Sequence, residues 1–368
     1  MSTVLLAVIA VILCVLFRIL NVNSQPHKPV IYGKDRNFIE NILFIAPFLN
    51  EPYIPTRLWG FSGHVQTILH SLIGRVRCPW PIGGRVSLVL PDRSTLTYDL
   101  YEPVGSQHED DVTVAICPGI GNTSESVYIR TYVHYSQCHG YRCAVLNHIG
   151  ALNSVPVTGT RIFSYGQTDD FSYMVENLLE RFPNTKLMLV GFSLGGNLIT
   201  KYLGEERKRP RNIIGGISIC QGYNAIERVH GFESVTDLYK WSSSAFYFHN
   251  IKTPMIFINA RDDPIVPEQL LPTIREFVSS HDKTMYLELA HGGHLGFYEG
   301  GLVYANPVTW LDRALVGLVG GLLMAHNKCS SKDAILDADS TVPEDEPDLI
   351  KPATIIYRDP LDKPTQKA

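Results

Sequence analysis

Six short apolar runs recur through the middle of the sequence, and the segments between them have helical periodicity. The runs are VTVAI (112–116), CAVLN (143–147), KLMLV (186–190), IIGGISI (213–219), PMIFINA (254–260) and MYLELA (285–290). Strands that are apolar on both faces are typical of a parallel sheet covered by helices on both sides. Earlier in the chain, alternating residues around Pro91-Asp92 in RVSLVLPDRSTLTYDLY predict an antiparallel hairpin. We therefore expect an α/β fold with a mostly parallel sheet and helices on both faces.

Two further segments predict helices that pack on this sheet. Between the second and third runs, apolar residues spaced as on one helical face are Phe171, Met174, Val175, Leu178, Leu179 and Phe182. After the last run, residues 306–325 predict a closing helix with Pro307 in its first turn. Asp312 and Arg313 interrupt the apolar surface of this second helix, which favours packing in the core over spanning a membrane.

The N-terminus is apolar from Val4 to Leu20 apart from Arg18. As a helix this run is about 26 Å long, close to the roughly 30 Å hydrocarbon core of a bilayer. Arg18 can reach the polar interface from the end of such a helix. We expect residues 1–22 to be a transmembrane anchor. A cleaved signal peptide ending near residues 22–24 is the alternative, but the apolar run is long and no Lys or Arg precedes it.

Two signals disagree about the side of the membrane on which the rest of the chain lies. The positive residues near the apolar run all lie at its end or after it, namely Arg18, Lys28, Lys34 and Arg36, and this bias alone would keep the following domain in the cytosol. The single glycosylation sequon, Asn122-Thr123-Ser124, indicates the opposite side. Beyond the anchor, we expect a spacer over 23–55, a folded domain over 56–328, and a disordered tail over 329–368 that is rich in Asp, Glu, Pro and Lys.

Charge and cysteine usage exclude several classes of function. The net charge is −4 and no stripe of Lys and Arg is present, so nucleic acid is not an expected partner. The seven cysteines have no CxxC spacing and several fall in strand-like runs, which predicts buried thiols rather than zinc ligands or a disulfide framework. HExxH and P-loop patterns are absent as well. We expect no metal and no cofactor.

The stretch VGFSLGGN (190–197) places a G-x-S-x-G motif at the end of an apolar run and before an amphipathic segment. A strand that turns abruptly into a helix strains the residue at the turn, so Gly191 and Gly195 flank Ser193. Such a turn lifts the serine hydroxyl above the sheet edge. It also leaves the N–H of Leu194 free to stabilise an oxyanion. A glycine-rich turn with an idle serine is the alternative.

A serine nucleophile needs a base that is oriented by an acid, and both follow in the chain. Arg261, Asp262 and Asp263 follow the fifth apolar run, and HGGHLGF (291–297) comes directly after the sixth. The carboxyl ends of parallel strands share one sheet edge, so these groups are expected near the serine. We assign Asp263 as the residue that orients the imidazole and His294 as the base. Asp262 is expected to be solvated or to cap a turn, and His291 to order its loop.

A second oxyanion donor is expected from the glycine-rich turn that follows VTVAI, at residues 117–122. The backbone N–H of Ile120 is the candidate. Asn122, the glycosylation candidate, belongs to the same turn. A glycan on it would therefore crowd the mouth of the site unless the side chain points away.

Several motifs together resemble the AB hydrolase 4 family of the AB hydrolase superfamily. They are GHVQTIL (63–69), AICPG (115–119), LNHIG (146–150), GFSLGGN (191–197), ISICQGY (217–223), DDPIVP (262–267) and HGGHLGF (291–297). The resemblance implies the α/β-hydrolase fold behind an N-terminal signal-anchor, a single-pass type II topology, and hydrolysis of monoacylglycerols and similar lipid esters. It also implies that Ser193, Asp263 and His294 are the catalytic triad.

The resemblance fails at the lid. Family members insert several helices between ISICQGYNA and the strand that precedes the acid, whereas only residues 225–252 intervene here. A reduced lid region is therefore expected. The leading hypothesis is a membrane-bound serine carboxylester hydrolase with a lipid ester as substrate. The alternative is a hydrolase-like membrane protein that binds lipid or regulates a partner without turnover.

Overall fold

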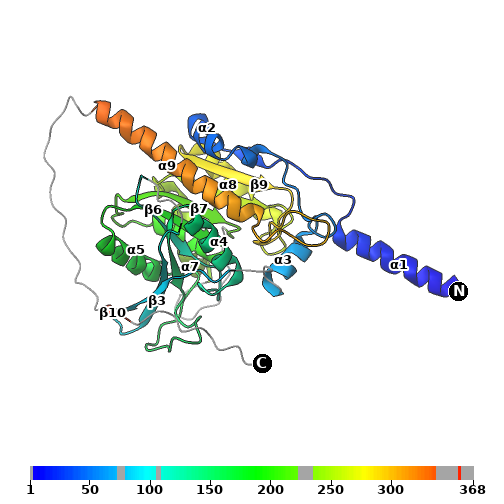
Figure 1. Ribbon diagram of the computed structural model, residues 1–368, viewed down its shortest axis with the longest axis horizontal. Coiled ribbons are helices and arrows are strands. Elements are labelled where there is room, and N and C mark those ends of the chain that lie inside the picture. Colours follow the sequence, from blue (N-terminus) through cyan, green and yellow to red (C-terminus); the bar gives the residue numbers. More distant parts are fainter. Residues whose placement is uncertain (1–2, 73–78, 105–108, 223–234, 337–354, 358–368) are drawn as a thin grey trace.

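A computed structural model describes residues 3–72, 79–104, 109–222, 235–336 and 355–357 (Figure 1). Its strands are β1 (Val30–Tyr32), β2 (Gly84–Val89), β3 (Thr95–Tyr101), β4 (Val112–Cys117), β5 (Arg142–Asn147), β6 (Lys186–Phe192), β7 (Ile213–Ile219), β8 (Met255–Ala260), β9 (Thr284–Leu289) and β10 (Ile355–Tyr357). They form one sheet in the order β1-β9-β8-β7-β6-β4-β5-β3-β2-β10. The strands from β5 to β9 pair in parallel, and those at both edges pair antiparallel. The predicted mostly parallel sheet and the β2–β3 hairpin are confirmed.

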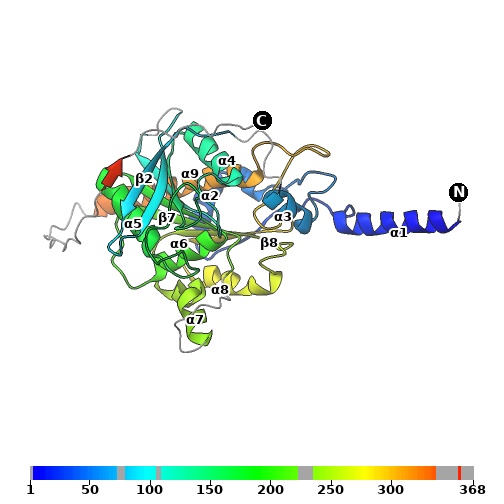
Figure 2. The same ribbon diagram turned by 90° about the horizontal axis from the view of Figure 1, so that it is seen from below.

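Helices cover both faces of this sheet, as expected. One layer contains α2 (Arg36–Ile45), α4 (Val127–Cys138) and α9 (Trp310–Leu336). The other contains α5 (Asp169–Arg181), α6 (Leu194–Gly204) and α8 (Pro272–Ser280). Figure 2 shows α4 and α9 on one side of the sheet and α6 and α8 on the other. Each layer closes a separate apolar core against its face of the sheet.

The two helices predicted from periodicity are present, and both ends of the closing helix differ from the prediction. The apolar face predicted for α5 is buried at Phe171, Met174, Val175 and Leu178. Helix α9 packs in the core as expected, but it begins three residues after Pro307. Its start is fixed by a reciprocal cap, because Asp312 accepts from the Thr309 N–H and Thr309 Oγ1 accepts from the Asp312 N–H.

The expected spacer over 23–55 differs from what the structure contains. Residues Val30–Tyr32 form β1, which pairs antiparallel with β9. Asp35 caps the start of helix α2. Phe38 and Ile42 of this helix are buried in the apolar core to which α9 also contributes. After it come η1 (Pro47–Asn50) and the buried Tyr53. This segment is therefore part of the folded domain, because β1 pairs with β9 and α2 packs against α9.

The expected tail and reduced lid are described only in part. Helix α9 continues to Leu336, and Ile355–Tyr357 forms β10 against β2, so the predicted tail contains regular structure in these two places. Residues 225–234 of the reduced lid region lie outside the described residues. The rest of that region forms α7 (Val235–Ser242) and η2 (Ser244–Asn250), and Phe248 of η2 is buried in the core.

Helix α1 (Thr3–Leu20) projects from the domain (Figures 1 and 2). None of its residues is buried. Within the described ranges it is the one helix long and apolar enough to cross a membrane. Its length and composition therefore fit the predicted anchor, although a signal sequence has the same properties.

Candidate active site

Ser193 occupies the turn between β6 and α6, in a backbone conformation that few residues adopt. Its φ is 52° and its ψ is −113°. The flanking glycines are required by close backbone contacts. A Cβ on Gly195 would lie 1.9 Å from the carbonyl oxygen of Cys117, and one on Gly191 would lie 2.3 Å from that of Gly195. The structure thus contains the strained strand-to-helix turn that the motif predicts.

We expect Gly195→Ala to lower the free energy of unfolding by about 3 kcal/mol or more, because the new methyl group meets backbone that cannot move aside. Urea unfolding of the full chain in detergent measures this loss. Gly84→Ala is the matched control, since a Cβ there meets nothing within 4 Å. Equal stability of the two variants would contradict the close contact at Gly195.

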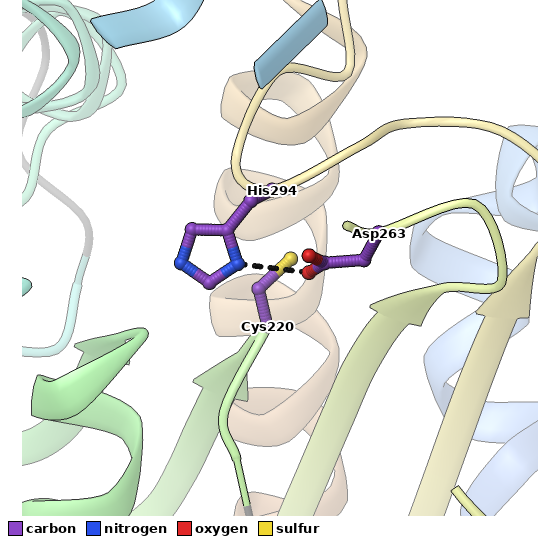
Figure 3. A group of neighbouring side chains, drawn as sticks. All are labelled: Cys220, Asp263 and His294. Atoms are coloured by element: carbon purple, nitrogen blue, oxygen red, sulfur yellow. Dashed lines mark hydrogen bonds and ion pairs between the residues drawn. The ribbon is translucent and has the colours of Figure 1, made fainter. Parts of the chain in front are cut away.

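The structure brings the three predicted triad residues together at the carboxyl edge of the sheet. Ser193 Oγ lies 2.8 Å from His294 Nε2, and His294 Nδ1 lies 2.8 Å from Asp263 Oδ2. Asp263 follows β8 and His294 follows β9, so adjacent parallel strands deliver the acid and the base. Figure 3 shows the imidazole and the carboxylate facing each other.

The carboxylate of Asp263 is held in one orientation. Its side chain is completely buried. The Oδ1 atom accepts hydrogen bonds from the backbone N–H groups of Ile265 and Val266, at 2.8 Å and 3.0 Å. Because these bonds occupy Oδ1, Oδ2 remains for the imidazole of His294. A buried carboxylate fixed in this way can hold the imidazole in the tautomer that accepts a proton at Nε2.

The second Asp–His pair braces the same loop. Asp262, expected to be solvated or to cap a turn, is partly exposed and binds a backbone N–H of the histidine loop. Asp262 Oδ1 accepts from the Gly293 N–H at 2.9 Å, and Asp262 Oδ2 lies 3.3 Å from His291 Nδ1. His291 Nε2 lies 2.8 Å from Ser24 Oγ. His291 therefore orders its loop, as expected, and it also ties that loop to the segment that follows α1.

Helix α3 (Gly63–Leu72) supports His294 in a way that the sequence did not indicate. Thr67 Oγ1 accepts from the backbone N–H of His294 at 2.8 Å and donates to the Gly63 carbonyl at 2.7 Å. Gln66 Oε1 accepts from the Tyr298 N–H at 2.9 Å. Both residues belong to GHVQTIL, but they lie more than two hundred residues from the loop they hold, so neither local periodicity nor spacing could reveal this role.

Thr67→Val tests this support. The change keeps the shape of the side chain but removes the acceptor of the buried His294 N–H, so we expect a loss of about 1–3 kcal/mol in the free energy of unfolding. We also expect a lower kcat, because the loop that carries the imidazole loses a fixed point. Thr67→Ser is the matched control, since it keeps the hydroxyl and should retain most of both quantities. Similar values for the two variants would show that the hydrogen bond is unimportant.

The two predicted oxyanion donors are the residue that follows Ser193 and a residue of the turn after β4. The turn after β4 passes close to the serine, because a Cβ on Gly119 would lie 3.6 Å from Ser193 Cβ. The Gly119 N–H is bonded to Tyr128 Oη at 3.0 Å. By contrast, the hydrogen bonds of the described residues include none donated by the Ile120 N–H or by the Leu194 N–H. The N–H of Leu194 is at the first position of α6, where no intrahelical partner exists.

Other buried groups hold the turn that carries Ile120. His148 Nε2 donates to the Pro118 carbonyl at 3.1 Å, and burial lowers the pKa of His148, which favours the neutral imidazole. Asn122 is half-buried, and its side-chain amide donates to the Ile120 carbonyl at 2.9 Å. The glycosylation candidate therefore lies directly beside the predicted oxyanion donor.

Cys220 completes a group of potential metal ligands with Asp263 and His294 (Figure 3). Their donor atoms lie within 4.8 Å of one another. Burial raises the pKa of the Cys220 thiol well above its ordinary value, which disfavours the thiolate that metals bind. His294 and Asp263 are already hydrogen-bonded to each other. The donor set therefore fits a neutral thiol packed beside an acid–base pair better than a metal centre.

Comparison with known proteins gives the same fold and several relatives. A family model for the alpha/beta hydrolase fold matches residues 112–238. Abhydrolase domain-containing protein 2 of Drosophila melanogaster is 55% identical over 392 residues, covering 89% of this chain and 98% of that protein. Monoacylglycerol lipase ABHD2 of Homo sapiens is 36% identical over 399 residues, covering 89% of this chain and 94% of that protein.

The alignment with the Drosophila protein spans more positions than the 368 residues of this chain, so that relative has residues with no counterpart here. Among solved structures, an α/β serine hydrolase without a lid from Xanthomonas campestris has a TM-score of 0.42 and 17% identity. That comparison covers 59% of this chain and 88% of the other.

Proposed function

The chain belongs to the abhydrolase domain-containing protein 2 family, and we propose that it is a membrane-bound serine hydrolase that cleaves carboxylic esters of lipids. The observation that carries this proposal is the unbroken series of hydrogen bonds from Ser193 through His294 to Asp263. Monoacylglycerols are the substrate class that we favour. Relatives named monoacylglycerol lipase support this choice, as does the apolar helix α1.

The proposed reaction proceeds through an acyl-enzyme. Ser193 Oγ attacks the ester carbonyl carbon while His294 Nε2 takes the serine proton, and Asp263 stabilises the resulting imidazolium. The backbone N–H groups of Leu194 and Ile120 hold the oxyanion of the tetrahedral intermediate. When the intermediate collapses, the alcohol leaves with the proton from His294. Water then attacks the acyl-enzyme by the same sequence of proton transfers and releases the fatty acid.

We also propose that α1 anchors the chain as a single-pass, type II membrane protein. This topology puts the hydrolase domain on the side where Asn122 can be glycosylated, against the direction of the charge bias. Expression in eukaryotic cells followed by endoglycosidase treatment tests it. A mass shift that disappears in Asn122→Gln would support the topology. Modification of the domain by a membrane-impermeant reagent that fails in intact cells but succeeds once the plasma membrane alone is permeabilised would contradict it.

Labelling with a fluorophosphonate probe tests the hydrolase assignment. The full chain and its Ser193→Ala variant are treated in detergent and examined by intact mass. We expect one adduct on the wild type and none on the variant, because only an activated serine reacts readily with this probe. No adduct on a wild type with native near-ultraviolet circular dichroism would overturn the assignment.

The second candidate function is a membrane protein that binds lipid or regulates a partner without turnover. Two observations support this candidate: the lid region at 225–252 is reduced, and the Drosophila relative has residues with no counterpart here. Hydrolysis of a short-chain ester and of a monoacylglycerol distinguishes the candidates. Turnover of both supports the lipase. Turnover of the short ester alone indicates a working triad without an acyl pocket, and turnover of neither favours the binding protein.

A further inference from the structure

Two surface loops are joined to each other by main-chain hydrogen bonds. We call them the anchor-side loops and define them as residues 54–59 and 299–306. The Leu58 N–H donates to the Leu302 carbonyl at 2.9 Å, and Trp59 Nε1 donates to the Val303 carbonyl at 2.7 Å. A further bond from the Asn306 N–H to the Glu299 carbonyl, at 2.8 Å, closes the second loop. The loops are therefore held in shape by their backbone.

Apart from Arg57 and Asn306, the side chains that these loops expose are apolar. The exposed large residues are Ile54, Leu58, Leu302, Val303 and Tyr304, and Tyr304 is 84% exposed. Because the backbone bonds fix both loops, these side chains cannot fold back into the core without breaking the pairing. A cluster of exposed apolar side chains on a rigid support is typical of a surface that another apolar phase covers.

The anchor-side loops lie at the end of the domain from which α1 projects (Figures 1 and 2). Hydrogen bonds fix the first residues after α1 to this end. Asn21 Nδ2 donates to the Phe61 carbonyl at 3.1 Å, and Ser24 Oγ lies 2.8 Å from His291 Nε2. Phe61 follows the first loop closely in the chain, and His291 precedes the second. The membrane surface reached by α1 therefore lies on the same side of the domain as the exposed apolar cluster.

We propose that the anchor-side loops insert into the interface of the bilayer that α1 spans. Trp59 and Tyr304 are residue types that favour this interface, and the exposed cation Arg57 lies where lipid phosphates would be. The second loop is continuous with the segment that carries His294, so insertion would hold the catalytic edge against the leaflet. A lipid ester could then pass from the bilayer to Ser193 without crossing bulk water. The proposal rests on the membrane placement proposed above and is independent of turnover.

Fluorescence quenching in liposomes measures the insertion. The full chain carries the environment-sensitive label NBD on a single introduced cysteine, Leu302→Cys, in phosphatidylcholine vesicles that contain nitroxide-labelled lipids. The background replaces by alanine the exposed Cys14, Cys138 and Cys329, and also Cys78, which lies outside the described residues. We expect emission at shorter wavelength and strong quenching. Tyr304→Cys provides a second position in case the first label disturbs the loop.

Two reference positions make the result decisive. Phe44→Cys is the matched control, because Phe44 is 76% exposed but belongs to α2, away from α1 (Figure 1). Ile12→Cys within α1 reports that the anchor is inserted. Quenching at 302 and 304 several times stronger than at 44 supports the proposal. Quenching at 302 and 304 no stronger than at 44, with position 12 quenched, overturns it.

The outcomes also separate this proposal from the hydrolase assignment. If position 12 is not quenched, the membrane placement is wrong and the proposed insertion is wrong with it. Fluorophosphonate labelling of the same liposome samples reports on Ser193 independently. If the loops insert but Ser193 does not react with the probe, the proposed insertion is supported and the hydrolase assignment is contradicted.

Discussion

Replacing Ser193 with alanine is expected to lower kcat for ester hydrolysis by about 10⁶-fold, because the proposed acyl-enzyme forms on the hydroxyl that is removed. The substitution removes the hydroxyl that lies 2.8 Å from His294 Nε2 and leaves the turn unchanged. Alanine has the same difficulty as serine at φ 52°, so the free energy of unfolding should stay close to that of the wild type. Initial rates with a short-chain ester measure the first quantity, and urea unfolding measures the second.

The control for this prediction is Ser279→Ala in α8. Ser279 is exposed, and its hydroxyl bonds only to the Arg275 carbonyl of its own helix. Its loss should leave kcat unchanged. A residue outside the reaction can be replaced with little loss of kcat. If Ser193→Ala retained about a tenth or more of the wild-type kcat, another nucleophile would be responsible and the assigned mechanism would be wrong.

The sheet and the order of the site residues could be predicted because both depend on local patterns. Six apolar runs with helical segments between them require parallel strands, and parallel strands put their carboxyl ends at one edge. Ser193, Asp263 and His294 each lie within four residues of the end of such a run, so their neighbourhood follows from topology. The hydrogen-bond distances among them are what the sequence could not supply.

Features that depend on distant contacts could not be predicted in the same way. Strand β1 has three residues, too few for a period, and exists because β9 offers an open edge. Asp262 differs from a solvated carboxylate only because Gly293 and His291 of another loop face it. Thr67 supports His294 for the same kind of reason. Each of these groups acquires its role from a partner that local pattern does not specify.

Asp263→Asn is expected to lower kcat by about 10⁴-fold, and the hydrogen bonds around the carboxylate explain why. Oδ1 accepts from two backbone N–H groups, at Ile265 and Val266. The amide oxygen of asparagine must take this position, because an amide NH₂ cannot accept hydrogen bonds. The NH₂ group then faces His294 Nδ1 in place of Oδ2. Nδ1 must become the acceptor, so the proton moves to Nε2, which can no longer take a proton from Ser193.

Asp262→Asn separates this effect from a general loss of order in the loop. Its amide oxygen can still accept from the Gly293 N–H, so the loop keeps one of its two contacts with this side chain. We therefore expect a much smaller fall in kcat than for Asp263→Asn, with similar stability of the two proteins. The kcat of both variants, measured from pH 6 to pH 9, provides the comparison. The two carboxylates are neighbours in the chain, and only their partners distinguish them. A larger loss of kcat in Asp262→Asn than in Asp263→Asn would therefore show that Asp262, not Asp263, orients the imidazole.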